Sequence, residues 1–178
     1  MNEKALIMDR DAVNRALTRI SHEITEKNHG VDNLMIVGVR RRGVSLARIL
    51  CEKMAEIEGK APAYGELDIT FYRDDLTLLA DHPEVKNTCP RLEVNDQCVV
   101  LVDDVIFTGR TVRAAIDCLM DMGRPRRIQL AVLIDRGHRE LPIRPDYVGK
   151  NVPTSLNEVI QVSTDDFDGE QSVRLFER

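Results

Sequence analysis

The sequence predicts an α/β fold in which a mainly parallel sheet is covered by helices on both faces. Apolar runs of strand length alternate with segments of helical spacing along the 178 residues. Some of these runs, such as LMIVGV (34–39) and CVVLV (98–102), are apolar throughout, which is typical of strands buried on both faces. Since no repeat, linker or low-complexity tract interrupts the pattern, we expect a single domain over residues 1–178.

Three helices are expected from the spacing of apolar residues and from their end signals. The first covers residues 9–28, with Asp9 or Asp11 as its cap and Gly30 after its end. The second covers residues 44–59 and ends at a glycine. The third covers residues 110–122, and its inward face consists of Val112, Ala115, Ile116 and Leu119.

Strands are expected wherever short apolar or β-branched runs lie between turn residues. Besides the two runs named above, they cover residues 65–72, 127–134 and 172–177, with shorter strands near 146–149 and 158–162. Residues 73–96 are polar and acidic and contain Pro83 and Pro90, so they predict a long loop.

The composition excludes several classes of protein. The net charge of −5 argues against a molecule that binds polyanions over its whole surface. No apolar run reaches the length of a membrane helix, and the first residues do not resemble a secretory signal, so a cytoplasmic protein is expected. The cysteines form no CxxC pair, which argues against a disulfide framework or a zinc site. Residues 121–150 are basic, which fits either a local anion site or solvated loops.

The most polar junctions of the chain follow four expected strands. They are RRRG after residue 39, RDD after 72, DD with TGRT after 102, and DRGHRE after 134. Because ligands of parallel sheets bind beyond the carboxyl ends of the strands, we expect the chemistry at these junctions.

The segment from residue 99 to 111 is the most informative motif. Four apolar residues lead to Asp103 and Asp104, and a short loop with Thr108 and Gly109 then opens a helix near Thr111. A helix start and hydroxyl groups hold a phosphate, while adjacent carboxylates accept hydrogen bonds from a diol or reach a magnesium ion. A Walker-B-like strand end is the alternative, but the chain has no GxxxxGK[ST] motif and no GxGxxG motif.

This segment resembles the loop of type I phosphoribosyltransferases that binds phosphoribosyl pyrophosphate (PRPP). ALTRISHEI (16–24), LDITFYRDDL (67–76) and residues 123–155 are similar to one branch, the PyrR family of pyrimidine operon regulators that are also uracil phosphoribosyltransferases. The resemblance implies a type I phosphoribosyltransferase fold with a small hood and a flexible lid loop. It implies the reaction of uracil and PRPP to UMP and pyrophosphate with Mg²⁺, UMP-dependent binding to pyr operon leader mRNA, and a homodimer or larger homo-oligomer.

The resemblance also implies roles for individual residues. Asp103, Asp104 and Arg136 are the expected catalytic residues, and the two carboxylates are the expected contacts of PRPP-bound magnesium. No general base is identified. The residues expected to bind PRPP or UMP are Arg40, Arg41, Arg73, Asp103, Asp104, Val105, Phe107, Thr108, Gly109, Arg110, Thr111, Val148 and Lys150.

Two positions favour a pyrimidine over a purine. Phe107 stands where the family usually has Tyr and where the similar 6-oxopurine transferases have Asp, and its ring offers no hydrogen bond to a purine nitrogen. Lys150 stands where those relatives carry an aromatic residue. A transferase for another nucleobase, or one without a role on RNA, remains the alternative.

An RNA surface is implied by the same resemblance. Its expected residues are Thr18, Arg19, His22, Arg144 and Lys150. Arginine pairs with phosphate and stacks on splayed bases, which suits single-stranded RNA. From the residues alone, a solvated helix face explains the same pattern.

Overall fold

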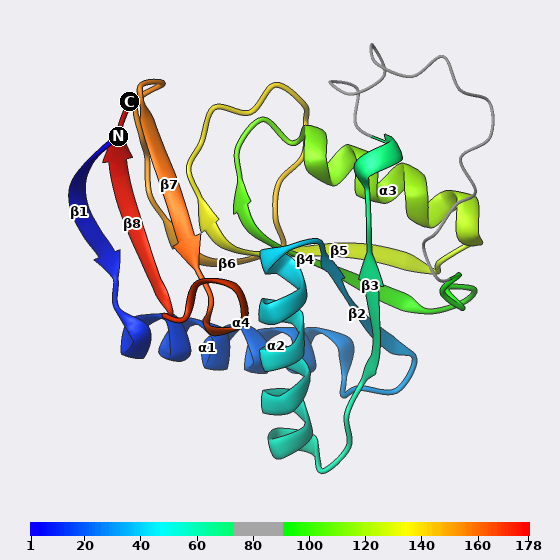
Figure 1. The fold of residues 1–178 in the computed structure, drawn as a ribbon. Helices are drawn as coiled ribbons and strands as arrows, with labels where there is room; N and C mark the ends of the chain where they lie inside the picture. The colour runs from blue at the N-terminus through cyan, green and yellow to red at the C-terminus, as the bar shows by residue number, and fades with distance from the viewer. Residues whose placement is uncertain (73–90) are drawn as a thin grey trace.

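The computed structural model describes residues 1–72 and 91–178, and its centre is a five-stranded parallel sheet of order β3-β2-β4-β5-β6 (Figure 1). The strands are β2 (Leu34–Val39), β3 (Ala63–Leu67), β4 (Cys98–Ile106), β5 (Arg127–Asp135) and β6 (Tyr147–Asn151). The chain adds β3 on one side of β2 and then crosses to the other side for β4. The carboxyl ends of β2 and β4 therefore form the switch point at which ligands of such sheets bind.

Helices cover both faces of this sheet, as the sequence predicts. On one face lie α1 (Arg10–Asn28) and α2 (Arg42–Glu58), and on the other lies α3 (Arg110–Met122) (Figure 1). One core contains Leu17 and Leu50 from the first two helices, and the second contains Leu119 from α3. The sheet strands contribute to both cores, which is why they are apolar throughout.

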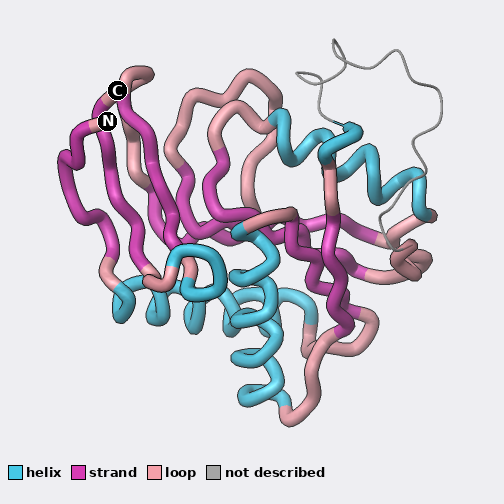
Figure 2. The backbone as a smooth tube through the Cα atoms, in the orientation of Figure 1, coloured by secondary structure: helices cyan, strands magenta, loops and turns pink. Residues whose placement is uncertain are grey.

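A second, smaller sheet lies beside the first in Figure 2. It is antiparallel, with the order β1-β8-β7, and consists of β1 (Asn2–Met8), β7 (Glu158–Ser163) and β8 (Ser172–Glu177). The short helix α4 (Asp165–Asp168) connects β7 to β8. The first strand was not among the predicted elements, because its amino-terminal half is exposed and its partner lies at the opposite end of the chain.

Two predicted strands end more than two residues away from their observed ends. The strand expected over 65–72 ends at Leu67, because the carboxylate of Asp68 accepts hydrogen bonds from Thr70 N and Thr70 Oγ1 and turns the chain into a 3₁₀ helix over Thr70–Tyr72. The strand expected to end at residue 102 continues to Ile106, because β5 pairs with it over that whole length. Both carboxylates of the DD pair therefore belong to the strand.

The helix boundaries agree with the predictions within two residues. Asp9 is the cap of α1, since its carboxylate accepts the N–H of Ala12 at 2.8 Å. His29 ends that helix in the left-handed conformation, and Gly30 follows with a φ of 107°. The expected lid, within 73–96, falls largely outside the described residues. None of the helices in the described ranges has the length and apolar character needed to cross a bilayer.

Candidate active site

The turn after β2 lies directly against the end of β4. A Cβ atom on Gly43 would lie 2.4 Å from the carbonyl oxygen of Val102, and one on Gly38 would lie 2.6 Å from Cα of Val44. Only glycine permits this approach, because backbone atoms stand at both places. The start of α2 is thus held next to Asp103 and Asp104, the residues that follow Val102.

Asp103 and Asp104 form a carboxylate pair in which Asp103 is buried and Asp104 is half-buried. Oδ1 of Asp103 accepts the N–H of Asp104 at 2.9 Å, and Oδ1 of Asp104 accepts the N–H of Val105 at 2.8 Å. Burial raises the pKa of both groups, and the charge of Asp104 raises the pKa of Asp103 further. The Arg42 guanidinium limits the rise in the pKa of Asp104 by attraction. Two such carboxylates favour a cation or hydroxyl donors between them.

The turn before α3 has the features of an anion site. Gly109 caps the helix with a φ of 92°, and the helix has neither a side-chain cap bond nor an acidic residue in its first turn. The hydroxyl of Thr108 accepts the N–H of Arg110 at 3.3 Å, which folds the turn back on itself. The positive end of the helix dipole is therefore not neutralised locally.

A cavity of about 680 Å³ joins the two turns. It is lined by Arg40 and Arg41 from the first turn and by Thr111 from the second. The Arg40–Arg41 peptide bond is cis, and the N–H of Arg40 donates to the carbonyl of Leu67 at 2.9 Å. The other lining residues are Val44, Arg48, Glu66, Asp68, Ile69, Thr70 and Phe167.

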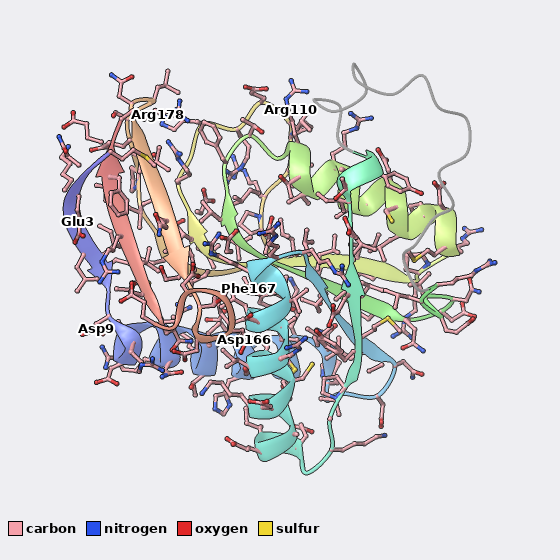
Figure 3. All side chains as sticks on the ribbon, viewed as in Figure 1. Glu3, Asp9, Arg110, Asp166, Phe167 and Arg178 are labelled. Carbon is pink, nitrogen blue, oxygen red and sulfur yellow. The ribbon has the colours of Figure 1, made fainter. Side chains whose placement is uncertain are left out.

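The short helix α4 fastens the smaller sheet to the start of α2. The carboxylate of Asp168 accepts from Nε and Nη2 of Arg42 at 3.2 and 2.9 Å. Oδ2 of Asp166 accepts from the hydroxyl of Ser45 at 2.9 Å. Figure 3 shows Asp166 and Phe167 beside the first turn of α2. The first turn of α2 contains no acidic residue of its own, so these carboxylates come from another part of the chain.

Arg136 is buried and has a different environment from the one expected. Its guanidinium lies 4.2 Å from the centre of the Phe107 ring, a cation–π contact. Its Nε donates to Thr154 Oγ1 at 3.0 Å, and its Nη2 donates to the carbonyls of Ser155 and Glu158 at 3.2 and 2.7 Å. Arg136 thus links the end of β5 to Phe107 and to β7, and its expected catalytic role stays a prediction.

Arg139 is a site residue to which the sequence assigned no role. It donates to the carbonyls of Phe107 and Ile143 at 2.8 and 3.0 Å and pairs with Asp135 at 2.5 Å. These bonds fasten the loop after β5 to the turn before α3. The sequence signal was its place in the polar DRGHRE junction, four residues after Asp135, whereas its bonds to the backbone carbonyls of Phe107 and Ile143 have no sequence signal.

A second cavity, of about 720 Å³, lies between the loop after β5 and strand β6. Val148, expected to bind the base, and Arg144, expected to bind RNA, both line it. Lys150, expected in both roles, is exposed, and its Nζ donates to the carbonyl of Ile7 at 3.3 Å. The structure therefore brings the expected base-binding residues next to part of the expected RNA surface.

The remaining expected RNA residues lie on α1, which packs against β6. The hydroxyl of Thr18 donates to the carbonyl of Asn14 within the helix, and His22 is exposed. Arg19 donates to the carbonyls of Val148 and Gly149. Arg73 lies outside the described residues. Among the residues that are described, no group of three or more His, Cys, Asp or Glu side chains is arranged as a metal site.

Comparison with known proteins identifies close relatives. The family described as "Phosphoribosyl transferase domain" matches residues 7–167. The chain is 60% identical over 175 residues to "Bifunctional protein PyrR" of Acetivibrio thermocellus, covering 98% of this chain and 95% of the relative. It is 58% identical over 177 residues to the protein of the same name from Clostridioides difficile, covering 99% of this chain and 100% of the relative.

A solved structure agrees with the fold. The hypoxanthine phosphoribosyltransferase of Trypanosoma cruzi superposes with a TM-score of 0.76 at 19% identity, over 98% of this chain and 96% of that one. At this identity the likeness concerns the arrangement of helices and strands alone.

Proposed function

Since the chain belongs to the phosphoribosyl transferase domain family, in its branch of bifunctional PyrR proteins, we propose that it is a uracil phosphoribosyltransferase that also regulates pyrimidine genes. It transfers the phosphoribosyl group of PRPP to uracil and yields UMP and pyrophosphate. With UMP bound, it attaches to pyr leader mRNA and attenuates transcription.

One observation supports the enzymatic part above all others. At the sheet's switch point, the Arg40–Arg41 turn and the start of α3 line one cavity, and Asp103 of β4 lies against Gly43 at the end of the same turn. Asp103 and Asp104 bind the two ribose hydroxyls, and the turn from Thr108 to Thr111 binds the 5′-phosphate. The 40–41 turn receives the pyrophosphate. PRPP carries these three groups on one sugar.

The chemistry requires alignment and charge placement. The bond between the sugar carbon C1′ and the pyrophosphate oxygen breaks, uracil N1 forms the new bond to C1′, and the N1 proton leaves. The carbon gains cationic character during transfer, which the neighbouring carboxylates stabilise. We assign no side chain as the general base.

The residues of the site fit a magnesium ion. Mg²⁺ in proteins is held by one or two carboxylates together with substrate phosphates, and Asp103 and Asp104 supply such a pair. Burial and the charge of Asp104 raise the pKa of Asp103, and a bound cation would favour its ionised form. When bound, the ion neutralises charge on the pyrophosphate group.

A direct assay tests the enzymatic part. Purified protein with PRPP and Mg²⁺ is expected to convert uracil into UMP much faster than it converts hypoxanthine into IMP. Phe107 supports this preference, because its ring offers no polar group to a purine. Equal or greater turnover of hypoxanthine would contradict the pyrimidine assignment.

The regulatory part is tested on RNA. Exposed Arg144 and Lys150, with Arg19 and His22 on α1, provide a local surface for single-stranded RNA. Affinity for pyr leader RNA is expected to rise with UMP and to fall steeply as salt increases. We propose that the protein acts as a homodimer or larger assembly, which light scattering in the same buffers will measure. A leader RNA affinity that UMP leaves unchanged would contradict the regulatory role.

A further inference from the structure

Arg19 joins the exposed face of α1 to strand β6. Its Nη2 donates to the carbonyl of Gly149 at 2.7 Å and to that of Val148 at 3.1 Å. Its Nη1 donates to Oε1 of Glu23, one turn along the helix, at 2.9 Å. The side chain is nevertheless 49% exposed. One guanidinium is therefore attached to the backbone of β6 on one side and accessible to solvent on the other.

The bonded carbonyls belong to an edge strand. Within the described residues, β6 pairs with β5 on one side only, so the carbonyls along its other edge have no strand partner. On the inner side, the backbone at Gly149 is so close to β5 that a Cβ atom would lie 2.4 Å from the carbonyl of Leu133. The peptides around Gly149 are thus held between β5 and Arg19. Because unpaired backbone acceptors are costly, this guanidinium has a definite effect on their orientation.

The same stretch of β6 carries the residues expected to bind the base. Val148 lines the 720 Å³ cavity, and Lys150 follows Gly149 directly. A rotation of the peptides at residues 148 and 149 would move the groups that face uracil. Within the described residues, Nε of Arg19 makes no hydrogen bond, so this donor is available to an RNA phosphate.

We propose that Arg19 is a positioning residue for the nucleotide site and that UMP and RNA influence each other through it. This inference rests on the proposed function. UMP bound at β6 fixes the carbonyls of residues 148 and 149, and these carbonyls hold the Arg19 guanidinium in one orientation. An RNA phosphate then binds this preorganised guanidinium at a lower entropic cost. By linkage, RNA raises the affinity for UMP by the same factor.

The first experiment measures the uracil site without RNA. Arg19→Gln is expected to raise KM for uracil and Kd for UMP about three- to tenfold, the effect of losing one or two hydrogen bonds, and to leave KM for PRPP unchanged. Arg19→Lys, which retains one donor group, is expected to show a smaller rise. Arg15→Gln is the matched control, because Arg15 lies one turn earlier on the same exposed helix face and makes no hydrogen bond to β6 within the described structure. An unchanged uracil KM in Arg19→Gln would overturn the positioning role.

The second experiment measures coupling. The ratio of leader RNA Kd without UMP to that with UMP is determined for wild type, Arg19→Lys and Arg15→Lys. Lysine keeps the charge but has no planar fork, so the ratio is expected to fall from about fivefold or more to below about twofold in Arg19→Lys only. A wild-type ratio in Arg19→Lys would overturn the coupling.

Two other outcomes have defined meanings. If Arg19→Lys binds no RNA at all, the Kd for UMP of the RNA-free variant decides, and a wild-type value overturns the proposal. If wild-type protein shows no effect of UMP on RNA, the regulatory part of the proposed function and the coupling fail together. The uracil KM of Arg19→Gln then still decides the positioning role independently.

Discussion

The two strand-to-helix turns at the switch point are built in opposite ways. The end of β4 and the turn after it carry their chemistry in side chains, namely the carboxylates of Asp103 and Asp104 on the strand and the hydroxyl of Thr108 in the turn. The turn after β2 places exposed arginine side chains at Arg40 and Arg41, while its backbone is packed against β4 at Gly43. The first turn depends on residue type, and the second depends on how closely two stretches of backbone approach.

This contrast explains why the chemistry of the turn after β4 could be predicted from the sequence, whereas the packing of the turn after β2 could not. Adjacent aspartates and a Thr-Gly pair at the end of a strand predict hydrogen-bond acceptors for a diol and a turn for a phosphate, because these are properties of the side chains themselves. A cluster of arginines at a helix start opposes the helix dipole. Its carboxylate partners come from other elements, because Arg42 pairs with Asp168, 126 residues away, and Arg40 pairs with Glu66 and Asp68. Substitutions in the two turns should therefore affect different quantities.

The largest effect is expected from Asp104→Asn in the side-chain turn. Asparagine keeps the shape and an acceptor oxygen but removes the charge that faces the sugar carbon and the metal. Steady-state assays with saturating PRPP and uracil should show turnover lower by about 10²–10³-fold, the usual cost of losing one electrostatic contact in an active site. Circular dichroism should match wild type, and the melting temperature should not fall, because burial raises the pKa of Asp104 and its ionised form does not favour folding. Turnover within about threefold of wild type would show that this carboxylate has no role in the transfer.

Gly43→Ala tests the backbone turn. The new Cβ would lie 2.4 Å from the carbonyl of Val102, so either α2 or β4 must shift, which typically costs about 1–3 kcal/mol. Urea unfolding should show this loss, and KM for PRPP should rise as the 40–43 turn moves. Gly59→Ala, at the other end of α2, is the control, because it has free space around it and only a left-handed φ of 70°. Equal PRPP KM values in the two variants would contradict the packing argument.

Asp103→Asn is expected to stabilise the protein while impairing PRPP binding. Burial and Asp104 raise the pKa of Asp103 in the folded state, so ionisation favours unfolding. The protonated carboxyl favours the folded state. This stability is fully present below the unfolded pKa of about 4, and it is lost as pH rises through the raised pKa of the folded state. Without PRPP and with a chelator, the variant should melt about 2–4 °C higher at pH 7, equivalent to about 1 kcal/mol. The difference should shrink towards pH 4, and a lower melting temperature at pH 7 would refute it.

The smallest effect is expected from Arg41→Gln. The side chain is exposed, and exposed charges contribute at most about 1 kcal/mol, so KM for PRPP should rise only about two- to fivefold. The rise should diminish in high salt because solvent-exposed charges are screened. A loss as large as that of Asp104→Asn would place pyrophosphate recognition on this side chain and remove the contrast between the two turns.

Elements formed by interactions between residues close in sequence were easier to predict than elements formed by residues far apart. The cap at Asp9 and the left-handed end at Gly59 are local, and both were predicted within their helices. The strand β1 pairs with β8, which lies at the opposite end of the chain, and no pattern in residues 2–8 predicts that partner. The bonds of Arg139 and Arg19 to backbone carbonyls were likewise not predicted, because every residue possesses a carbonyl group.

The sequence by itself determined the α/β alternation, the three main helices and the carboxylate-threonine turn, because periodicity and side-chain chemistry are local properties. Only the tertiary structure decided that α2 starts against β4, that Arg136 stacks on Phe107 inside the protein, and that Arg19 holds the edge of β6. The contacts of α2 and Arg19 involve backbone atoms, which are the same at every position of the chain. The contact between Arg136 and Phe107 depends on how the ends of two neighbouring strands pack together.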